Sequence, residues 1–407
     1  MNSSEKQRLL CEQAEEEIRL KVLEELDEYP ELSDEKLLVL IREAVIELGK
    51  RESLDVGTRI VIEQDVFNSL RKLDVLQTLI DDPEITEIMI NGADRIFVER
   101  KGRLEATGLK FSSTEKLEDI IQVIVGKRNQ IVNASIPIVD TRLDDGSRVN
   151  IILPPVAVDQ PIVTIRRFSK QPYTMDSLIA KNSLSRELAD FVKGLVSARY
   201  NIFVSGGTGS GKTTFLNAMT EYIPSGERVI TIEDTAELQL IGVDNLVRME
   251  ARNANLDGEL EITIRDLVRA SLRMRPDRII VGECRGAEAL EVLQANNTGH
   301  DGSLSTGHAN STIDMVSRLE TMVLMGMDLP IAAIRKQIAS GIDIFIHLAR
   351  LPNGRRVVEE IAEVRGIEEG EVRLQTLYRY VGEDDNWVKI EGLQNTEKLK
   401  SRQLMYS

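Results

Sequence analysis

A glycine-rich stretch, GGTGSGKTT over residues 206–214, constrains this 407-residue chain more than any other feature. It fits the pattern G-x-x-x-x-G-K-[ST], in which a loop without bulky side chains lets backbone N–H groups surround phosphate oxygens. The apolar segment NIFVS precedes the loop and a helical pattern follows it. The positive end of that helix adds to the attraction for an anion. This context predicts an α/β sheet that binds a nucleotide.

The individual loop positions have different expected contributions. Lys212 is expected to reach the β- and γ-phosphates, and the Thr213 hydroxyl to bind Mg²⁺. Thr214 is a weaker candidate for the α-phosphate. The expected nucleotide-binding residues are Gly207, Thr208, Gly209, Ser210, Gly211, Lys212, Thr213 and Thr214. ATP and Mg²⁺ are the expected cofactors, although the motif alone indicates only phosphate binding.

Carboxylates follow two further apolar segments. TIEDTAELQL carries Glu233 and Asp234, and RIIVGE ends in Glu283. In open α/β sheets ligands bind beyond the carboxyl ends of the strands, so either glutamate could activate the attacking water or hold Mg²⁺ through water. A solvated or helix-capping pair is the alternative for Glu233 and Asp234. Gly282 stands where many proteins with this loop carry an Asp, and the sequence leaves open which glutamate is the base.

The chain has three histidines. His308, in STGHAN, follows a third strand-like segment and is a candidate to hydrogen-bond the γ-phosphate. His300 falls in a predicted turn, where a structural role is the stronger interpretation. His347, within the apolar segment DIFIHLAR, is expected to belong to the scaffold.

Arginines are dense near these segments. Phosphoryl transfer needs positive charge on the equatorial oxygens, often from an arginine of another domain or subunit. The nearby arginines are Arg248, Arg252, Arg269, Arg273, Arg275, Arg278 and Arg285, and an upstream segment adds Arg142, Arg148, Arg166 and Arg167. For each one taken singly, a salt bridge or a solvated surface position is the alternative.

Residues 1–74 are predicted to be helical. Leu10, Ala14, Ile18 and Val22 recur every fourth residue, a second stripe covers 37–48 behind a Ser33 N-cap, and a third helix is expected over 63–73. A small bundle with an acidic face is the main interpretation, and a docking module for a partner is the alternative.

Two further domains are expected, over 75–172 and 173–407. The first reads as α+β, with a capping box at SSTE (112–115), a hairpin around 144–146 and a linker over 169–177. In the second, strands and helices alternate, which is typical of a parallel sheet covered by helices. A final pair of strands is expected around the turn at Asn353 and Gly354.

Composition narrows the function. The net charge of −16 argues against an extended nucleic-acid track, so nucleic acid is an unlikely partner. Two isolated cysteines, Cys11 and Cys284, exclude a disulfide framework and a cysteine zinc cluster. No signal peptide is evident and no run approaches the roughly 20 apolar residues that cross a bilayer. We expect a cytoplasmic protein that contacts membranes through partners.

The combined motifs resemble a known family. Beside the loop, these are RLDDGSRVNIILPP (142–155), IEDTAELQL (232–240) and the long block 272–311, of which the last is the most specific. The chain resembles the type II/IV secretion and pilus-assembly ATPases, with the tight-adherence (Flp) pilus branch as the nearest match, from about residue 60 to at least residue 350. The resemblance implies a RecA-like C-terminal domain, a smaller α+β N-terminal domain, and a homo-hexamer with ATP between subunits.

The resemblance also implies residue roles. The acidic box would be Glu233, Asp234 and Glu237, the Walker B acid Glu283, and the histidine box would hold His300 and His308. N-terminal-domain arginines reach the γ-phosphate in such proteins, which favours Arg142, Arg148 and Arg166. The C-x-x-C zinc motifs of some relatives are missing, and Cys284 replaces a branched apolar residue.

The expected function is therefore a mechanochemical ATPase at the cytoplasmic face of a membrane. It would act on an inner-membrane platform protein of a pilus or secretion machine. One rival is a nucleic-acid motor, of which a DNA-transfer secretion ATPase is the nearest form. The other is an ATP-binding scaffold or switch with little turnover. The exported substrate and the direction of force stay open.

Overall fold

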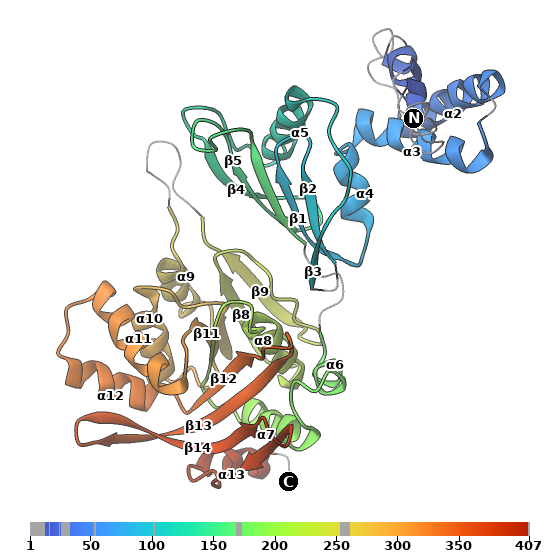
Figure 1. Cartoon of the computed structure of the whole chain (residues 1–407). Helices are drawn as coiled ribbons and strands as arrows, with labels where there is room; N and C mark the ends of the chain where they lie inside the picture. The colour runs from blue at the N-terminus through green and yellow to red at the C-terminus, as the bar shows by residue number, and fades with distance from the viewer. Residues whose placement is uncertain are drawn as a thin grey trace. The chain divides into compact units, whose positions relative to one another are not determined.

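The computed structural model describes residues 13–15, 17–23, 25, 33–52, 54–100, 102–167, 173–252 and 261–405. The chain divides into two compact units, Met1–Ser169 and Lys170–Ser407, and each is described by itself (Figure 1). Leu10 and the first part of the predicted linker, through Pro172, lie outside the described residues.

The first unit begins with helices. α2 (Asp34–Arg51) and α3 (Val56–Arg71) pack with the helical residues 17–23 around a core that contains Ile18, Leu37 and Ile62. The predicted start of the third helix at residue 63 is wrong, because Asp55 caps a helix that begins at Val56 by accepting a hydrogen bond from the Thr58 amide. Ser33 is the N-cap residue of α2 as predicted, but its side chain makes no capping bond.

A six-stranded antiparallel sheet completes the first unit, in the order β3-β2-β1-β6-β5-β4. Its strands are β1 (Ile85–Asn91), β2 (Ile96–Arg100), β3 (Arg103–Ala106), β4 (Ile138–Arg142), β5 (Arg148–Ile152) and β6 (Ile162–Arg166), with helices α4 (Val75–Asp81) and α5 (Thr114–Gly126). The apolar stripe of α5 is buried with alternate residues of the sheet, such as Val149 and Ile165. The predicted capping box is displaced, since Ser113 rather than Ser112 caps α5 and accepts from the Lys116 amide.

The second unit is built on a nine-stranded sheet in the order β15-β14-β13-β12-β7-β11-β10-β8-β9, which is parallel from β12 through β9. Its strands are β7 (Ile202–Gly206), β8 (Arg228–Glu233), β9 (Asn245–Glu250), β10 (Arg278–Val281), β11 (Leu304–His308), β12 (Ile344–Arg350), β13 (Arg356–Glu368), β14 (Glu371–Val381) and β15 (Asn386–Lys389). The hairpin predicted around Asn353 and Gly354 is confirmed as β12 and β13.

Helices cover both faces of this sheet (Figure 1). Alternate residues of β7 go to opposite cores: Ile202 and Val204 to one, Phe203 to the other. Strands buried on both faces read as continuous apolar runs, which is why they stood out in the sequence. The helices are α6 (Met175–Ala180), α7 (Arg186–Ser197), α8 (Lys212–Met219), α9 (Ile264–Ser271), α10 (Glu288–Asn297), α11 (Thr312–Gly326), α12 (Ile331–Gly341) and α13 (Glu397–Met405).

Candidate functional site

The strand order collects the predicted polar residues at one edge of the sheet. β7 leads into the glycine loop. Counting outward from β7 across the sheet, the next strands are β11, β10 and β8. β11 ends in His308, Glu283 lies just beyond β10, and Glu233 ends β8. Because parallel strands present their carboxyl ends at the same edge, all three side chains lie on the side of the sheet where the loop lies.

The loop has the backbone shape that an anion cradle needs. Gly209 and Gly211 have φ angles of +70° and +93°, which residues with a side chain rarely adopt. Gly211 is the N-cap of α8, so the first amides of that helix follow the loop directly. Among the described residues, the buried Ser210 Oγ has no hydrogen-bond partner. A bound phosphate would satisfy such groups.

The ammonium group of Lys212 lies against the backbone of the loop. Its Nζ donates to the carbonyl oxygens of Gly206 and Gly207, both at 3.0 Å, and lies 3.3 Å from His308 Nδ1. Only 7% of the residue is exposed, and burial lowers the pKa of its ammonium group. The lysine is therefore positioned at the loop with donors that a phosphate can take over from the carbonyls.

Glu233 is the most buried carboxylate of the site, with 3% of the residue exposed. Its carboxylate accepts hydrogen bonds from the Glu237 amide at 3.0 Å and the Leu238 amide at 3.0 Å. Burial raises the pKa of Glu233 to about 7, although these two bonds oppose the rise. A carboxyl group with this pKa can take up or release a proton near neutral pH.

The position of Glu233 explains why residue 282 is a glycine. A Cβ at position 282 would lie 2.8 Å from the Glu233 Cγ and 3.2 Å from its Oε1. The Asp that many related loops carry at this place cannot coexist with Glu233 in this position. The departure seen in the sequence is thus a steric consequence of where the other carboxylate packs.

Glu283 lies between His308 and Arg285. Its Oε1 is 2.8 Å from His308 Nε2, an ion-pair distance without hydrogen-bond geometry, and its Oε2 accepts from Arg285 at 2.7 Å. Arg285 also lies 3.5 Å from Asp234. Burial, together with the charge of Lys212, lowers the pKa of His308.

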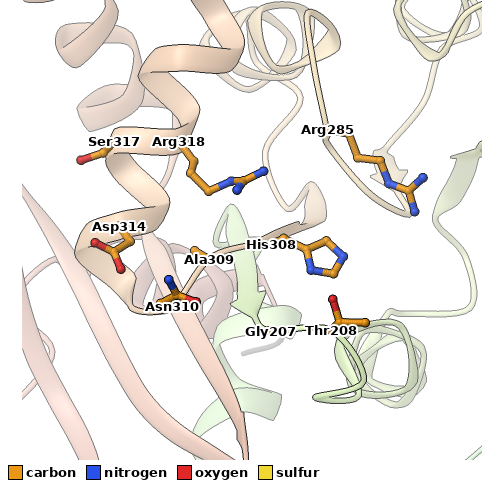
Figure 2. Close-up of a pocket in the computed structure, with 9 residues that line it drawn as sticks. All are labelled: Gly207, Thr208, Arg285, His308, Ala309, Asn310, Asp314, Ser317 and Arg318. Carbon is orange, nitrogen blue, oxygen red and sulfur yellow. The ribbon is translucent and has the colours of Figure 1, made fainter.

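A pocket of about 830 Å³ opens from the loop toward α11. Figure 2 shows the residues that line it, which are Gly207, Thr208, Arg285, His308, Ala309, Asn310, Asp314, Ser317 and Arg318. The α11 residues of this wall were not predicted from the sequence. The available signal was helical spacing: Asp314 and Arg318 are four residues apart and so share one face of α11, beside the buried Met315, Leu319 and Met322.

Arg356 is a second residue at the loop that was not predicted from the sequence. Arg356, at the start of β13, donates from Nε to the Gly209 carbonyl at 2.8 Å. β12 pairs in parallel with β7, the strand that leads into the loop. Arg350 of β12 pairs with Arg356 of β13, so Arg356 lies close to the loop. Only the strand order reveals this contact, because Arg356 is far from the loop in sequence.

The three upstream arginines lie together in the first unit. Arg142 of β4 faces Arg148 of β5 in register, and Arg148 faces Arg166 of β6. Buried Val149 and Ile165 alternate with them, so the three guanidinium groups lie on the face of the sheet that is turned away from the core. The structure therefore gathers the site residues in two groups, one in each unit.

Other candidates have structural environments. Arg278 is fully buried and pairs with Glu227. His347 is buried with its Nδ1 2.8 Å from Ser205 Oγ, in keeping with the predicted scaffold role. His300 lies after α10, where its Nδ1 is 3.3 Å from the Ala295 carbonyl. His300 is not among the residues that line the pocket.

No group of three or more His, Cys, Asp or Glu side chains within the described ranges could hold a metal ion. In nucleotide sites Mg²⁺ usually takes most of its ligands from phosphate and water. The half-buried Thr213 in the first turn of α8 and the two strand-end glutamates fit that arrangement.

A glycine loop between a central parallel strand and a helix, with carboxylates at the neighbouring strand ends, defines a P-loop nucleotide-binding protein. Residues 69–385 match the family model described as Type II/IV secretion system protein, and the chain belongs to this family of secretion ATPases. The predicted family and fold class are confirmed. The finer assignment to the tight-adherence pilus branch stays a prediction.

The relatives carry secretion and transfer names. A putative conjugal transfer protein of Mycobacterium tuberculosis is 34% identical over 310 residues, which cover 75% of this chain and 87% of that protein. The type IV secretion system protein VirB11 of Brucella suis is 30% identical over 305 residues, 68% of this chain and 84% of that one. The structure of the Legionella pneumophila ATPase DotB matches at 25% identity with a TM-score of 0.50, covering 69% and 77%.

Proposed function

We propose that this protein is an ATP-hydrolysing motor that powers pilus assembly or secretion across a membrane. The observation that carries the proposal is the meeting of Lys212, Glu233, Glu283 and His308 at one edge of the sheet, in a chain of the secretion ATPase family. Three parts would divide the work: helices over 1–74, an α+β part over 75–172 and the ATPase part over 173–407.

The proposed reaction is hydrolysis of the γ-phosphate. The oxygen of a water molecule bonds to the γ-phosphorus, and the bond from that phosphorus to the β–γ bridging oxygen breaks. ADP leaves with the electron pair, one proton of the water passes to a carboxylate, and the other stays on the phosphate formed. Glu283 and Glu233 are the two candidates for that base, and the raised pKa of Glu233 suits it to accept a proton near pH 7.

Thr213 would hold Mg²⁺ directly, while Glu233 and Glu283 would hold its water ligands. The metal would neutralise charge on the β- and γ-phosphates. In this proposal, Thr208, Ser210 and the loop amides surround the phosphates, Thr214 lies toward the α-phosphate, and Lys212 bridges the β- and γ-phosphates.

We further propose that Arg142, Arg148 and Arg166 close over the γ-phosphate from the first unit of the same or a neighbouring subunit. Their alignment across three adjacent strands supports this, because it concentrates positive charge on one face. A homo-hexameric ring with ATP between subunits would then couple hydrolysis to movement of the units. A platform protein at the cytoplasmic face of the inner membrane would receive that movement.

A second candidate function is DNA transfer, in which the motor serves a conjugation machine. The specific observation in its favour is the M. tuberculosis relative, which is named as a conjugal transfer protein. The net charge of −16 speaks against a strong direct track for DNA.

No helix in the described part of the chain is long and apolar enough to span a bilayer.

Steady-state phosphate release by the purified full chain tests the proposal. We expect the wild type to turn over ATP and Lys212→Ala to abolish turnover, while Lys336→Ala on the exposed face of α12 changes nothing. Glu283→Gln and Glu233→Gln should keep ATP binding and lose hydrolysis. Near-normal turnover in both carboxylate variants refutes the site, and a wild type without steady-state release indicates a scaffold or switch instead.

Two further measurements choose between the forms of the motor. ATPase activity is compared with and without DNA at a stated salt concentration, because electrostatic DNA binding depends on salt. Affinity purification from membranes then identifies the partner. A co-purified platform membrane protein supports pilus assembly or secretion, and DNA-stimulated turnover supports the conjugation motor.

A further inference from the structure

Arg318 is a charged group at the site that the proposed mechanism does not yet use. It lies on α11, and its side chain is exposed on the wall of the pocket that begins at the glycine loop. Figure 2 shows Arg318 extending from α11 toward His308, with Arg285 on the other side of the ring. Two guanidinium groups therefore flank the space above His308.

Arg285 and Arg318 differ in their bonding partners. Arg285 is bound by Glu283 at 2.7 Å and lies 3.5 Å from Asp234. Within the described ranges, no hydrogen bond or ion pair of the Arg318 guanidinium is found. Asp314, one helical turn earlier, is a ready partner by spacing, but its carboxylate points away from Arg318 (Figure 2). Arg318 thus faces the pocket without a carboxylate that neutralises it.

The pocket connects Arg318 to the phosphate end of the loop. Lys212 Nζ donates to the Gly207 carbonyl, and Gly207 and Thr208 line the pocket together with Arg318. The pocket therefore starts where the ammonium group lies, and in this motif that group marks the β- and γ-phosphates. The positive charge of Arg318 also reaches His308, where it contributes to the lowered pKa of the ring.

We propose that Arg318 binds an oxygen of the terminal phosphoryl group of ATP from within the same subunit. This rests on the proposed function, in which the loop binds ATP. A guanidinium group matches a phosphoryl group because two parallel N–H donors meet two oxygens. Arg285 is already bound by Glu283, so Arg318 is the guanidinium group on this wall that is left for the phosphoryl group. Arg318 would then distinguish ATP from ADP before any arginine of the first unit is engaged.

The test measures binding by titration calorimetry with the full chain and Mg²⁺. The probes are ADP and adenosine 5′-(β,γ-imido)triphosphate, which keeps a terminal phosphoryl group and is not hydrolysed. We expect Arg318→Gln to weaken binding of the triphosphate analogue roughly tenfold, the lower end for a hydrogen bond to a charged group, and to leave ADP affinity unchanged. Arg318→Lys should recover part of the loss, because it keeps the charge but not the fork.

Lys336→Gln on α12 is the matched control, since it removes one positive charge outside the pocket and should alter neither affinity. Equal affinity of Arg318→Gln and the wild type for the analogue overturns the inference. So does an equal loss for ADP, which would show a disturbed loop instead. Loss of inhibition by inorganic phosphate with unchanged analogue binding also overturns it, in favour of a product site.

Because binding needs no turnover, the two proposals fail separately. A wild type that binds the analogue through Arg318 but releases no phosphate refutes the hydrolysis proposal alone. A wild type that hydrolyses ATP while Arg318→Gln binds the analogue normally refutes this inference alone.

Discussion

Burial of Glu233 makes stability depend on pH in a direction that can be predicted. Its carboxyl group has a pKa of about 7 in the folded protein, against 4.5 for an ordinary Glu, mainly because burial disfavours the charged form. Between these pH values the unfolded chain releases a proton that the folded chain keeps. The free energy of unfolding must therefore fall as pH rises through this window.

The substitution that tests this is Glu233→Gln, which removes the ionisation and keeps an oxygen to accept from the Glu237 and Leu238 amides. The two pKa values differ by about 2.5, and ~1.36 kcal/mol for each unit gives at most ~3.4 kcal/mol. The Gln variant should gain stability relative to the wild type between pH 4.5 and 7 and hold a constant advantage above pH 7. Any fixed cost of the amide group cancels, because only the change with pH is read.

Urea unfolding at a series of pH values provides the measurement. Trp387, the single tryptophan of the chain, lies on β15 of the same sheet, where its Nε1 donates to the Val358 carbonyl. Its fluorescence therefore reports on the second unit alone. A difference between the two proteins that is the same at pH 4.5 and pH 8 would refute a raised pKa at Glu233.

Two further variants test how the site is built. Gly282→Ala brings a Cβ to 2.8 Å from Glu233 Cγ, so steady-state phosphate release should fall about a hundredfold, the loss expected when a reacting group is misplaced by about 1 Å. Gly286→Ala, whose Cβ would meet nothing closer than 3.4 Å, is its control, and equal activity of the two variants would contradict the steric argument. Arg356→Gln loses the bond to the Gly209 carbonyl, and ADP affinity should fall roughly fivefold, since a bond of this kind contributes about 1 kcal/mol when exposed. Arg373→Gln on β14, which breaks an ion pair with Glu368 at the other end of β13, should leave ADP affinity unchanged in the same calorimetric titration.

Much of the fold was predictable because it depends on local patterns. The apolar runs that became β7, β8 and β10 are visible in the sequence, as both of their faces are buried. The first residue of a helix was harder to predict where two neighbouring residues can each act as the N-cap. Ser112 and Ser113 are adjacent potential caps, and only the hydrogen bond from the Lys116 amide selects Ser113.

The residues that escaped prediction depend on strand order and on helix faces. Arg356 reaches the loop only because β12 pairs with β7, a neighbour relation that no sequence motif records. Arg318 is one of many surface arginines until α11 is placed beside His308. The reason for Gly282 is likewise steric, since it needs the position of Glu233 on the adjacent strand.

The row formed by Arg142, Arg148 and Arg166 has an energetic consequence for the first unit. Like charges on directly facing strand positions repel one another, and pairing of β4, β5 and β6 holds three guanidinium groups side by side. Salt screens that repulsion, and an anion that docks across the three strands relieves it locally. Folding of the sheet, and not the anion, therefore brings these three positive charges together.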